Sequence, residues 1–419
     1  MGTDERMLRS SEEAIEHISG ICFKTGPPQR IGVELEWTTH YAGDPAAYLK
    51  PGDLAAALGE HTPATLGNPH PAPLPGGSTV TVEPGGQIEI SSAVADDLAG
   101  LYRALSADHA TLTELLARAG IVLGERGIDP HRPPRRILDT PRYAAMERAF
   151  DRAGRTMMGS TAGLQVCFDA GTPQQDAGGP QRDAGTPRQD AGTPKQGAGT
   201  PQRWAALNEM GPALIALFAN SRRHAGRDTR WESARMGAWL AMEPRRTGPV
   251  PVGDDPAADW ARYALDAPLL CVRREEGDWD APAGLTLAGW IASDDPPTVD
   301  DAEYHLSTLF PPVRPRGYLE VRYLDTQPGD EWIAPVAALS ALLGDDLIID
   351  RARAAAAPAA GRWHAAARAG LADPPVRAAA RALAELACRN LDRTGLPAGV
   401  RDRVSGILSR RLHAVAAAA

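Results

Sequence analysis

The fold of this chain is decided by the stretch IGVELEW, residues 31–37, in which apolar residues alternate with glycine or glutamate. This period of two predicts a half-buried β-strand whose apolar side chains face a core. Glu34 and Glu36 then share the opposite face. Two carboxylates side by side on one strand repel each other unless a cation or another partner lies between them. The stretch therefore predicts a strand that carries a cation-binding site.

Three later stretches repeat this alternation: TVTVEPGGQIEIS at 79–91, GLQVCFD at 163–169 and YLEVRY at 318–323. In the first of them, a Pro-Gly-Gly turn separates two alternating runs, as in a hairpin. The expected polar face of these strands carries Gln87, Glu89, Ser91, Gln165, Cys167, Asp169, Glu320 and Arg322. The pattern predicts an antiparallel sheet with one apolar face and one face open to solvent. We expect the functional site on the open face.

Composition and charge exclude several classes of protein. The chain has 419 residues, and its polar-faced strands extend from residue 31 to residue 323, which favours a single domain over 1–419. The net charge of −9 argues against nucleic acid as a partner. The four cysteines contain no C-x-x-C pair, so we expect a reducing cytoplasm and neither a zinc finger nor a disulfide framework. No apolar run approaches membrane-spanning length. The oligomeric state is left open.

Two further segments have a clear pattern. Residues 94–119 carry leucines at helical spacing, which predicts a long amphipathic helix behind the sheet, and residues 331–419 read as a helical C-terminal part of the same domain. Residues 169–203 are five copies of a heptad related to DAGTPQQ. The copies contain nothing to bury, so we expect residues 170–203 to be a disordered insertion, with folding resumed at Trp204.

The residue types on the polar face indicate the chemistry. Clustered glutamates with a glutamine, and without a His-Cys set, form a hard-oxygen site that suits Mg²⁺ or Mn²⁺ and not zinc. The arginines between residues 222 and 246 can neutralise phosphates or carboxylates. Acids for a metal and arginines for anions together indicate ATP-dependent phosphoryl transfer. The chain lacks both a G-x-x-x-x-G-K-[ST] motif and a protein-kinase glycine loop, so neither of those folds is expected.

Seven runs, in order along residues 10–345, resemble the glutamate–cysteine ligase family of plants and bacteria, most of all its actinobacterial branch, which serves ergothioneine biosynthesis. They are IGVELEW, VEPGGQIEIS, PRYAAM, MMGSTAGLQVCFD, LFANS, ARMGAWLAMEPRRTG and HLSTLFPPVRPRGYLEVRYLD. An ordered set of this kind is far more specific than any single motif. The resemblance implies an α+β, glutamine-synthetase-like fold, in which an antiparallel sheet curves into a funnel and helices pack behind it.

The resemblance also implies a reaction and roles for particular residues. The reaction would be the ATP- and Mg²⁺-dependent ligation of the L-glutamate γ-carboxylate to L-cysteine through a γ-glutamyl phosphate. The implied metal ligands are Glu34, Glu36, Glu83, Glu89 and Glu320. The implied substrate and ATP contacts are Arg235, Arg246, Arg314, Arg322 and Gln165, with Arg235 and Arg322 also catalytic.

Two alternatives to this function stay open at the level of sequence. One is the same activation chemistry with a different amine acceptor, because acceptor choice depends on the shape of a pocket. The other is a non-catalytic protein that binds ATP or an amino acid, although retention of all five glutamates argues against it. Cys167 departs from the Asn or His that relatives often carry, and its role is left open between packing and catalysis.

Overall fold

The computed structural model describes residues 4–24, 30–171 and 199–413. Its centre is a six-stranded antiparallel sheet with the order β3-β4-β1-β6-β10-β9. These strands are β1 (Ile31–Trp37), β3 (Thr79–Val82), β4 (Ile88–Ser91), β6 (Gly163–Phe168), β9 (Val313–Pro315) and β10 (Leu319–Asp325). Two small sheets pair β2 (Thr39–Tyr41) with β5 (Ile121–Leu123), and β7 (Arg223–His224) with β8 (Arg227–Asp228). All four expected strand stretches are therefore in one sheet.

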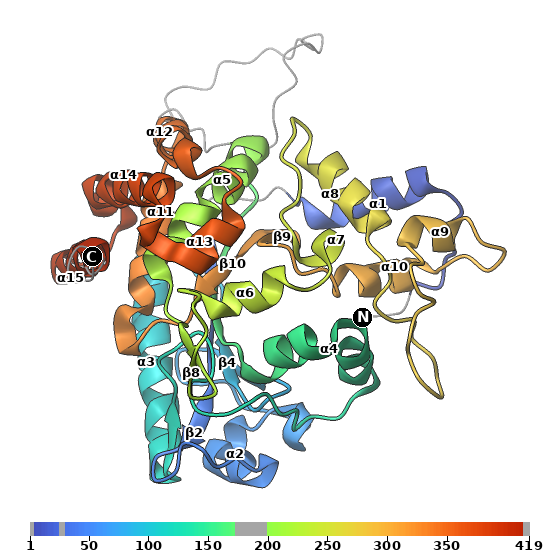
Figure 1. Cartoon of the computed structure of the whole chain (residues 1–419), viewed down its shortest axis with the longest axis horizontal. Coiled ribbons are helices and arrows are strands. Elements are labelled where there is room, and N and C mark those ends of the chain that lie inside the picture. Colours follow the sequence, from blue (N-terminus) through green and yellow to red (C-terminus); the bar gives the residue numbers. More distant parts are fainter. Residues whose placement is uncertain (1–3, 25–29, 172–198, 414–419) are drawn as a thin grey trace, which may run out of the picture.

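Helices surround this sheet (Figure 1). They are α1 (Ser11–Cys22), α2 (Pro51–Leu58), α3 (Leu98–Arg118), α4 (Pro141–Ser160), α5 (Thr200–Phe218), α6 (Ala234–Leu240), α7 (Pro244–Thr247), α8 (Pro256–Asp266), α9 (Leu287–Ile291), α10 (Val299–Leu306), α11 (Ile333–Leu342), α12 (Asp346–Ala356), α13 (Trp363–Ala369), α14 (Pro374–Asn390) and α15 (Ala398–His413). Figure 1 shows α5 gathered with α11 to α14, and α1 gathered with α8 to α10.

The apolar face of the sheet forms the core that the alternation predicts. The side chains of Ile31, Val33, Leu35, Trp37, Ile88, Ile90, Leu164, Val166, Phe168, Leu319, Val321 and Tyr323 are all buried. Helix α5 packs against β10, and the Tyr323 hydroxyl donates a hydrogen bond of 3.2 Å to the Leu207 carbonyl. Helix α3 contacts β1, where His109 stacks on Trp37 at 5.0 Å between ring centroids. The expected helix behind the sheet is confirmed.

The polar face differs from the expectation, because other elements cover much of it and its glutamates are only partly exposed. Glu320 is 0% exposed and Gln165 only 4%. Side chains from α4, from α6 and from the segment after α10 lie over this face and enclose a cavity with it. Sequence periodicity reports which side chains share a face, but covering by residues distant in the chain leaves no local pattern. The site is therefore a pocket partly covered by these elements and not an open sheet face.

The heptad segment lies mostly outside the described residues, so its expected disorder is not tested. Its last copy does enter the structure: α5 begins at Thr200 and not at Trp204, with Pro201 in its first turn. Proline is well suited to that position, since its missing N–H would have no helical partner there. Arg203 Nη1 lies 3.5 Å from Asp169 Oδ2, so an ion pair joins the two ends of the segment.

Among the described helices, none is by itself both long and apolar enough to span a membrane. One pair, Gly329–Leu342 with Asp346–Ala359, has sufficient length and apolar content when its two helices are taken together, and these meet at a bend of 113°.

Packing of α5 on α13 leads to a first prediction. A Cβ atom at Gly211 would overlap the indole ring of Trp363, which is buried and cannot move aside freely. Gly211→Ala is therefore expected to lower the free energy of unfolding by about 1–3 kcal/mol, as overpacked cores do. Urea unfolding measures the loss. Gly20→Ala in α1 is the matched control, because open space surrounds that position and alanine favours a helix. Equal stability of the two variants would contradict the packing described.

Candidate active site

Strand register brings the predicted polar residues onto one face of the sheet. Glu36 lies opposite Glu89, and Glu34 lies between Ser91 on β4 and Gln165 on β6. Glu83 follows β3 in the turn before β4, where its carbonyl accepts from the Gly86 N–H at 2.9 Å. Gly86 has a φ of 89°, a left-handed conformation that glycine adopts without strain. The Pro-Gly-Gly turn thus places Glu83 beside the strand glutamates.

A cavity of about 400 Å³ covers this face. Its acidic wall consists of Glu34, Glu36, Glu83 and Glu89, with Gln87 and Gln165 beside them. Four arginines also line it: Arg142, Arg314, Arg316 and Arg322. The rest of the lining is largely apolar or aromatic and includes Tyr143, Met146, Met157, Met158, Trp239 and Phe310. Of the ten predicted site residues, the structure brings seven to this one cavity.

The acidic wall carries carboxyl groups that the protein does not fully neutralise. Burial, together with the charge of Glu320, raises the pKa of Glu34 to about 7. Burial and the neighbouring Glu36 raise the pKa of Glu83 to about 7. Burial and Glu83 raise the pKa of Glu89 well above its ordinary value. Buried acids that repel one another in this way are stabilised when a cation joins them.

This repulsion predicts that removing one acid stabilises the metal-free protein. The pKa of Glu83 rises from 4.5 to about 7 on folding, so its ionisation costs stability above pH 7 and costs none below pH 4.5. Glu83→Gln in the presence of a chelator is expected to raise the melting temperature at pH 8 and to change it little at pH 4.5. Thermal unfolding at the two pH values measures this difference.

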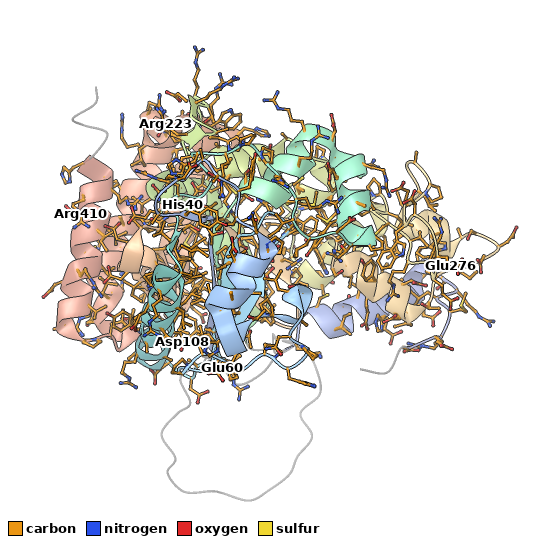
Figure 2. All side chains as sticks on the ribbon, turned by 90° about the horizontal axis from the view of Figure 1, so that it is seen from below. His40, Glu60, Asp108, Arg223, Glu276 and Arg410 are labelled. Atoms are coloured by element: carbon orange, nitrogen blue, oxygen red, sulfur yellow. The ribbon has the colours of Figure 1, made fainter. Side chains whose placement is uncertain are left out.

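The control for that measurement is Glu276→Gln, at an exposed glutamate that Figure 2 shows at the outer edge of the molecule. It should change the melting temperature at neither pH. A lower melting temperature for Glu83→Gln at pH 8 would show that Glu83 has a stabilising partner and would contradict the repulsion.

Glu320 differs from the four cavity acids. Its oxygens accept from Arg314 Nε at 2.7 Å and Arg314 Nη2 at 3.1 Å, and Arg322 Nη1 adds a third contact at 3.0 Å. Burial alone would raise the pKa of Glu320, but Arg314 and Arg322 outweigh it and hold the pKa at about 2. Glu320 does not line the cavity, and its oxygens already have cationic partners. In this geometry it orients two arginines, which was not expected from the sequence.

Gln165 links the acidic wall to the arginines. Its side-chain amide donates to Glu36 Oε1 at 2.9 Å, and its carbonyl oxygen accepts from Arg322 Nη1. Glu36 Oε2 accepts a second hydrogen bond, of 2.7 Å, from the Gly163 N–H. The chain of contacts fixes Glu36 and Arg322 relative to each other. Their positions in the cavity are therefore set before any ligand binds.

Arg235 and Arg246 do not line the cavity, which corrects their expected role as direct anchors. Arg235 is 2% exposed, and its Nη2 donates to the Arg322 carbonyl at 2.9 Å. Arg246 is 1% exposed and donates to the carbonyl and hydroxyl of Thr308 at 2.6 and 2.8 Å and to the Pro268 carbonyl. Both guanidinium groups donate hydrogen bonds to protein carbonyls, so they hold the backbone next to the cavity in place and do not line the cavity themselves.

Two arginines that sequence reasoning did not select do line the cavity. Arg142 donates to the Ser307 hydroxyl at 2.9 Å and lies over the ring of Tyr304, without a carboxylate partner among the described residues. Arg316 approaches Glu320 only to 3.9 Å, and its side chain is 50% exposed. Both lie in runs that carried the family resemblance, PRYAAM and PPVRPRG. The position of Arg142 and Arg316 within these runs was the sequence signal that could have identified them as site residues.

Cys167 pairs in register with Gly32 and Glu320 but does not line the cavity. Burial and the charge of Glu320 raise the pKa of its thiol well above the ordinary value. A thiol that stays protonated is a poor nucleophile. The structure thus favours packing over catalysis for Cys167.

The cavity offers carboxylate and amide oxygens, which are the ligands that a hard cation such as Mg²⁺ prefers. In the described part of the chain, no three acidic, histidine or cysteine side chains converge closely enough to bind a metal ion by themselves. Mg²⁺ rarely needs such a cage, since it usually takes one or two carboxylates together with water and substrate phosphates. Four partly buried carboxyl groups around one cavity can supply those contacts.

An antiparallel sheet whose cavity combines acids for a cation with arginines for anions suits phosphoryl or acyl transfer. Comparison with known proteins makes the class specific. The sequence model of glutamate–cysteine ligase family 2 matches residues 30–177 and 191–410, and the chain belongs to this family of ATP-dependent ligases.

Individual relatives agree with this assignment. The chain is 36% identical over 400 residues to glutamate–cysteine ligase EgtA of Mycolicibacterium smegmatis, covering 90% of this chain and 84% of that protein. It is 37% identical over 412 residues to EgtA of Mycobacterium tuberculosis, covering 93% and 85%. The chloroplastic ligase of Arabidopsis thaliana is 28% identical over 285 residues, covering 65% of this chain and 50% of that protein.

A solved structure confirms the fold. The crystal structure of glutamate–cysteine ligase from Francisella tularensis in complex with AMP superposes with a TM-score of 0.51 at 13% identity, covering 93% of this chain and 83% of that chain. The expected α+β fold, with an antiparallel sheet and helices packed on it, is correct.

Proposed function

We propose that this chain joins the γ-carboxylate of L-glutamate to the amine of L-cysteine at the expense of ATP, giving γ-glutamylcysteine for ergothioneine biosynthesis. The relatives that support it are the mycobacterial ligases. The observation that carries it is the cavity that four partly buried acids and four arginines line together. The whole chain would act as one catalytic domain, with the three small molecules as its partners.

The chemistry has two steps. An oxygen of the glutamate γ-carboxylate attacks the terminal phosphorus of ATP, so ADP leaves and a γ-glutamyl phosphate forms. The cysteine amine then attacks the acyl carbon, the C–O bond to phosphate breaks, and the amine loses a proton as the amide forms. Both steps crowd negative charge into the cavity. Stabilising that charge with fixed cations is the main catalytic need.

The described side chains supply fixed cations in suitable places. Arg322 is held by Glu320 and Gln165, so its guanidinium is oriented before substrate arrives. Among the described residues, no carboxylate lies within 3.5 Å of Arg142 or Arg316, so both can donate hydrogen bonds to the carboxylate or phosphate groups of the substrates.

Glu34, Glu36, Glu83 and Glu89 would hold Mg²⁺ or Mn²⁺, which when bound neutralises phosphate oxygens. Glu320 acts in this proposal through the arginines that it orients. Arg235, which donates to the Arg322 carbonyl, becomes a positioning residue.

The test is phosphate release from ATP and Mg²⁺ with L-glutamate, with and without L-cysteine, followed by mass analysis of the product. Turnover that needs both amino acids and yields γ-glutamylcysteine is the expected result. Turnover with glutamate but without dependence on cysteine would retain acyl-phosphate chemistry and assign another amine as acceptor. Absence of turnover would overturn the proposal in favour of a binding protein.

A further inference from the structure

The end of β10 carries a buried carboxylate that the proposed chemistry does not use. Asp325 is 2% exposed and does not line the cavity. Just before it, β10 contains a bulge, in which Arg322 and Tyr323 both lie opposite Gln165 of β6. A bulge takes a residue out of regular strand pairing and changes the direction of its side chain. The placement of Arg322 therefore depends on contacts outside the regular pairing of β10 with β6.

Three donors from two other segments converge on the Asp325 carboxylate. Its Oδ2 accepts hydrogen bonds from the Asn220 N–H at 2.8 Å and from the Ser221 hydroxyl at 2.7 Å, just after α5. Its Oδ1 accepts from the Ser233 hydroxyl at 2.8 Å, just before α6. One buried carboxylate therefore ties the end of β10 to the segment that follows α5 and to the start of α6.

The two serines connect this carboxylate to the backbone of α6. Ser221 Oγ accepts the N–H of Arg235 at 3.1 Å. Ser233 Oγ caps the helix and accepts the N–H of Met236 at 3.2 Å. A hydroxyl group has one proton and two lone pairs. Because both protons are donated to Asp325, the lone pairs of the two serines are directed to the N–H groups. The carboxylate thus fixes both hydroxyls and, through them, the first turn of α6.

The side chain of Arg235 extends from this turn to the backbone beside the acidic wall. Its Nη2 donates to the carbonyl of Arg322, in the bulge, at 2.9 Å. The same guanidinium lies against Gly163, where a Cβ atom would overlap it. The Gly163 N–H in turn donates to Glu36 Oε2 at 2.7 Å. Arg235 therefore contacts both the backbone of Arg322 and the glycine that orients Glu36.

Asp325 also provides negative charge near Arg235, which is itself buried. Burial lowers the pKa of Arg235, and the charges of Glu36 and Asp325 oppose this effect. A buried cation is costly unless opposite charge lies near it. Glu36 lines the cavity, where a bound cation would take up part of its charge, whereas Asp325 does not. Asp325 is therefore the acid whose charge remains available to Arg235 when the cavity is filled.

We propose that Asp325 is a positioning residue of the active site and acts through Arg235. It fixes the first turn of α6 with two serine hydroxyls, and so keeps the Arg235 guanidinium on the Arg322 carbonyl and against Gly163. This inference rests on the proposed function, in which Arg322 stabilises developing negative charge. Displacing a catalytic group by about 1 Å can cost about 10²-fold in rate, so a residue outside the cavity can control the reaction in this way.

The first test is Asp325→Asn, which keeps the shape of the side chain but replaces one acceptor oxygen by an amide group. We expect kcat for γ-glutamylcysteine formation to fall by about tenfold to hundredfold. The KM values for ATP and L-glutamate should change by less than about threefold, because the contact to developing charge is affected and ground-state binding is not. An unchanged kcat in folded Asp325→Asn would overturn the proposal.

Asp108→Asn in α3 is the matched control (Figure 2). Asp108 is also fully buried and accepts hydrogen bonds from the N–H groups of Gly76 and Ser78, but it does not line the cavity. The control should lower the free energy of unfolding, as Asp325→Asn does, and retain kcat. An equal loss of kcat in the two variants would overturn the specific role of Asp325, because any buried amide would then have the same effect.

A double-mutant cycle tests whether Asp325 acts through Arg235. Arg235→Met should itself lower kcat, and the further change Asp325→Asn should lower it by less than about threefold more. Multiplied losses would overturn the proposal, because Asp325 would then act by another route. Ser221→Ala keeps the carboxylate but removes its link to the Arg235 N–H, so it provides the test if Asp325→Asn does not fold. It should lower kcat by about threefold to tenfold, and a retained kcat would overturn the proposal.

Hydrogen exchange separates this inference from the ligase proposal. In Asp325→Asn, and not in Asp108→Asn, amide exchange within α6 should become about tenfold faster, because the first turn of the helix loses its attachment. This result would support the attachment of α6 to Asp325 even if the unmodified protein ligated no amino acids. Unchanged exchange within α6 would overturn the inference even if ligation were observed.

Discussion

Replacing Glu34 by glutamine is expected to lower kcat for ATP-dependent phosphate release by about 10²–10³-fold, the loss typical when one electrostatic contact to developing charge is removed. Glu34 lies at the centre of the sheet, between Ser91 on one neighbouring strand and Gln165 on the other. Its pKa of about 7, raised by burial and by Glu320, marks a carboxyl group without a full cationic partner in the protein. Glutamine keeps the shape but supplies no negative charge for a cation.

The fold should survive this change, because removal of a repelled charge does not cost stability. A melting temperature equal to or above that of the unmodified protein, together with the loss of turnover, is the expected pair of results. Glu276→Gln, at the exposed edge of the molecule, should retain full activity. Full activity in Glu34→Gln would remove this residue from the metal site and leave the acidic wall without its central member.

Arg314→Met is expected to lower the free energy of unfolding by about 3–5 kcal/mol, the usual result of leaving a buried charge without its partner. Arg314 makes two hydrogen bonds to Glu320, which is 0% exposed. Methionine fills similar space but donates no hydrogen bond. Arg322 retains a single contact to Glu320 at 3.0 Å and cannot replace the lost pair.

The effect of Arg314→Met should depend on pH in a defined direction. Folding lowers the pKa of Glu320 from 4.5 to about 2, so its stabilising contribution is complete above pH 4.5 and disappears as the pH falls toward 2. Urea unfolding should show the largest difference from the unmodified protein near pH 7 and a smaller one near pH 3.

Two further variants make that result specific. Arg316→Met is the control, since Arg316 is half exposed and 3.9 Å from Glu320, and exposed pairs contribute less than about 1 kcal/mol. Adding Glu320→Gln to Arg314→Met should recover part of the stability, because the unpaired charge is gone. If Arg314→Met and Arg316→Met have equal free energies of unfolding, the buried Arg314–Glu320 pair does not contribute the expected stability.

The sequence predicted the strands and the shared face of their polar residues because both follow from a period of two. Once Ile31 and Val33 face a core, Glu34 and Glu36 must face the other way, and antiparallel register brings Gln165 and Glu89 beside them. The four acids of the cavity wall were therefore accessible to reasoning from local pattern and from resemblance.

Other parts of the site depend on contacts that no local pattern records. The motifs around Arg235 and Arg246 showed that arginines are present there, but not that they are directed to the carbonyls of Arg322 and Thr308. The apolar part of the cavity lining comes from α4, α6 and the segment after α10, which meet only in the folded chain. Covering of the polar face by these elements was unpredictable for the same reason.

The ion pair between Asp169 and Arg203 has a practical consequence for handling the protein. Because Arg203 Nη1 lies 3.5 Å from Asp169 Oδ2, the chain leaves the end of β6 and enters α5 at nearly the same point. The entropic cost of closing a loop grows only slowly with its length, so the number of residues between Gly171 and Gly199 can be changed at little cost, whereas the buried Ala170 and the first turn of α5 should be kept. This junction is therefore a suitable position for an affinity tag or a fluorescent reporter domain.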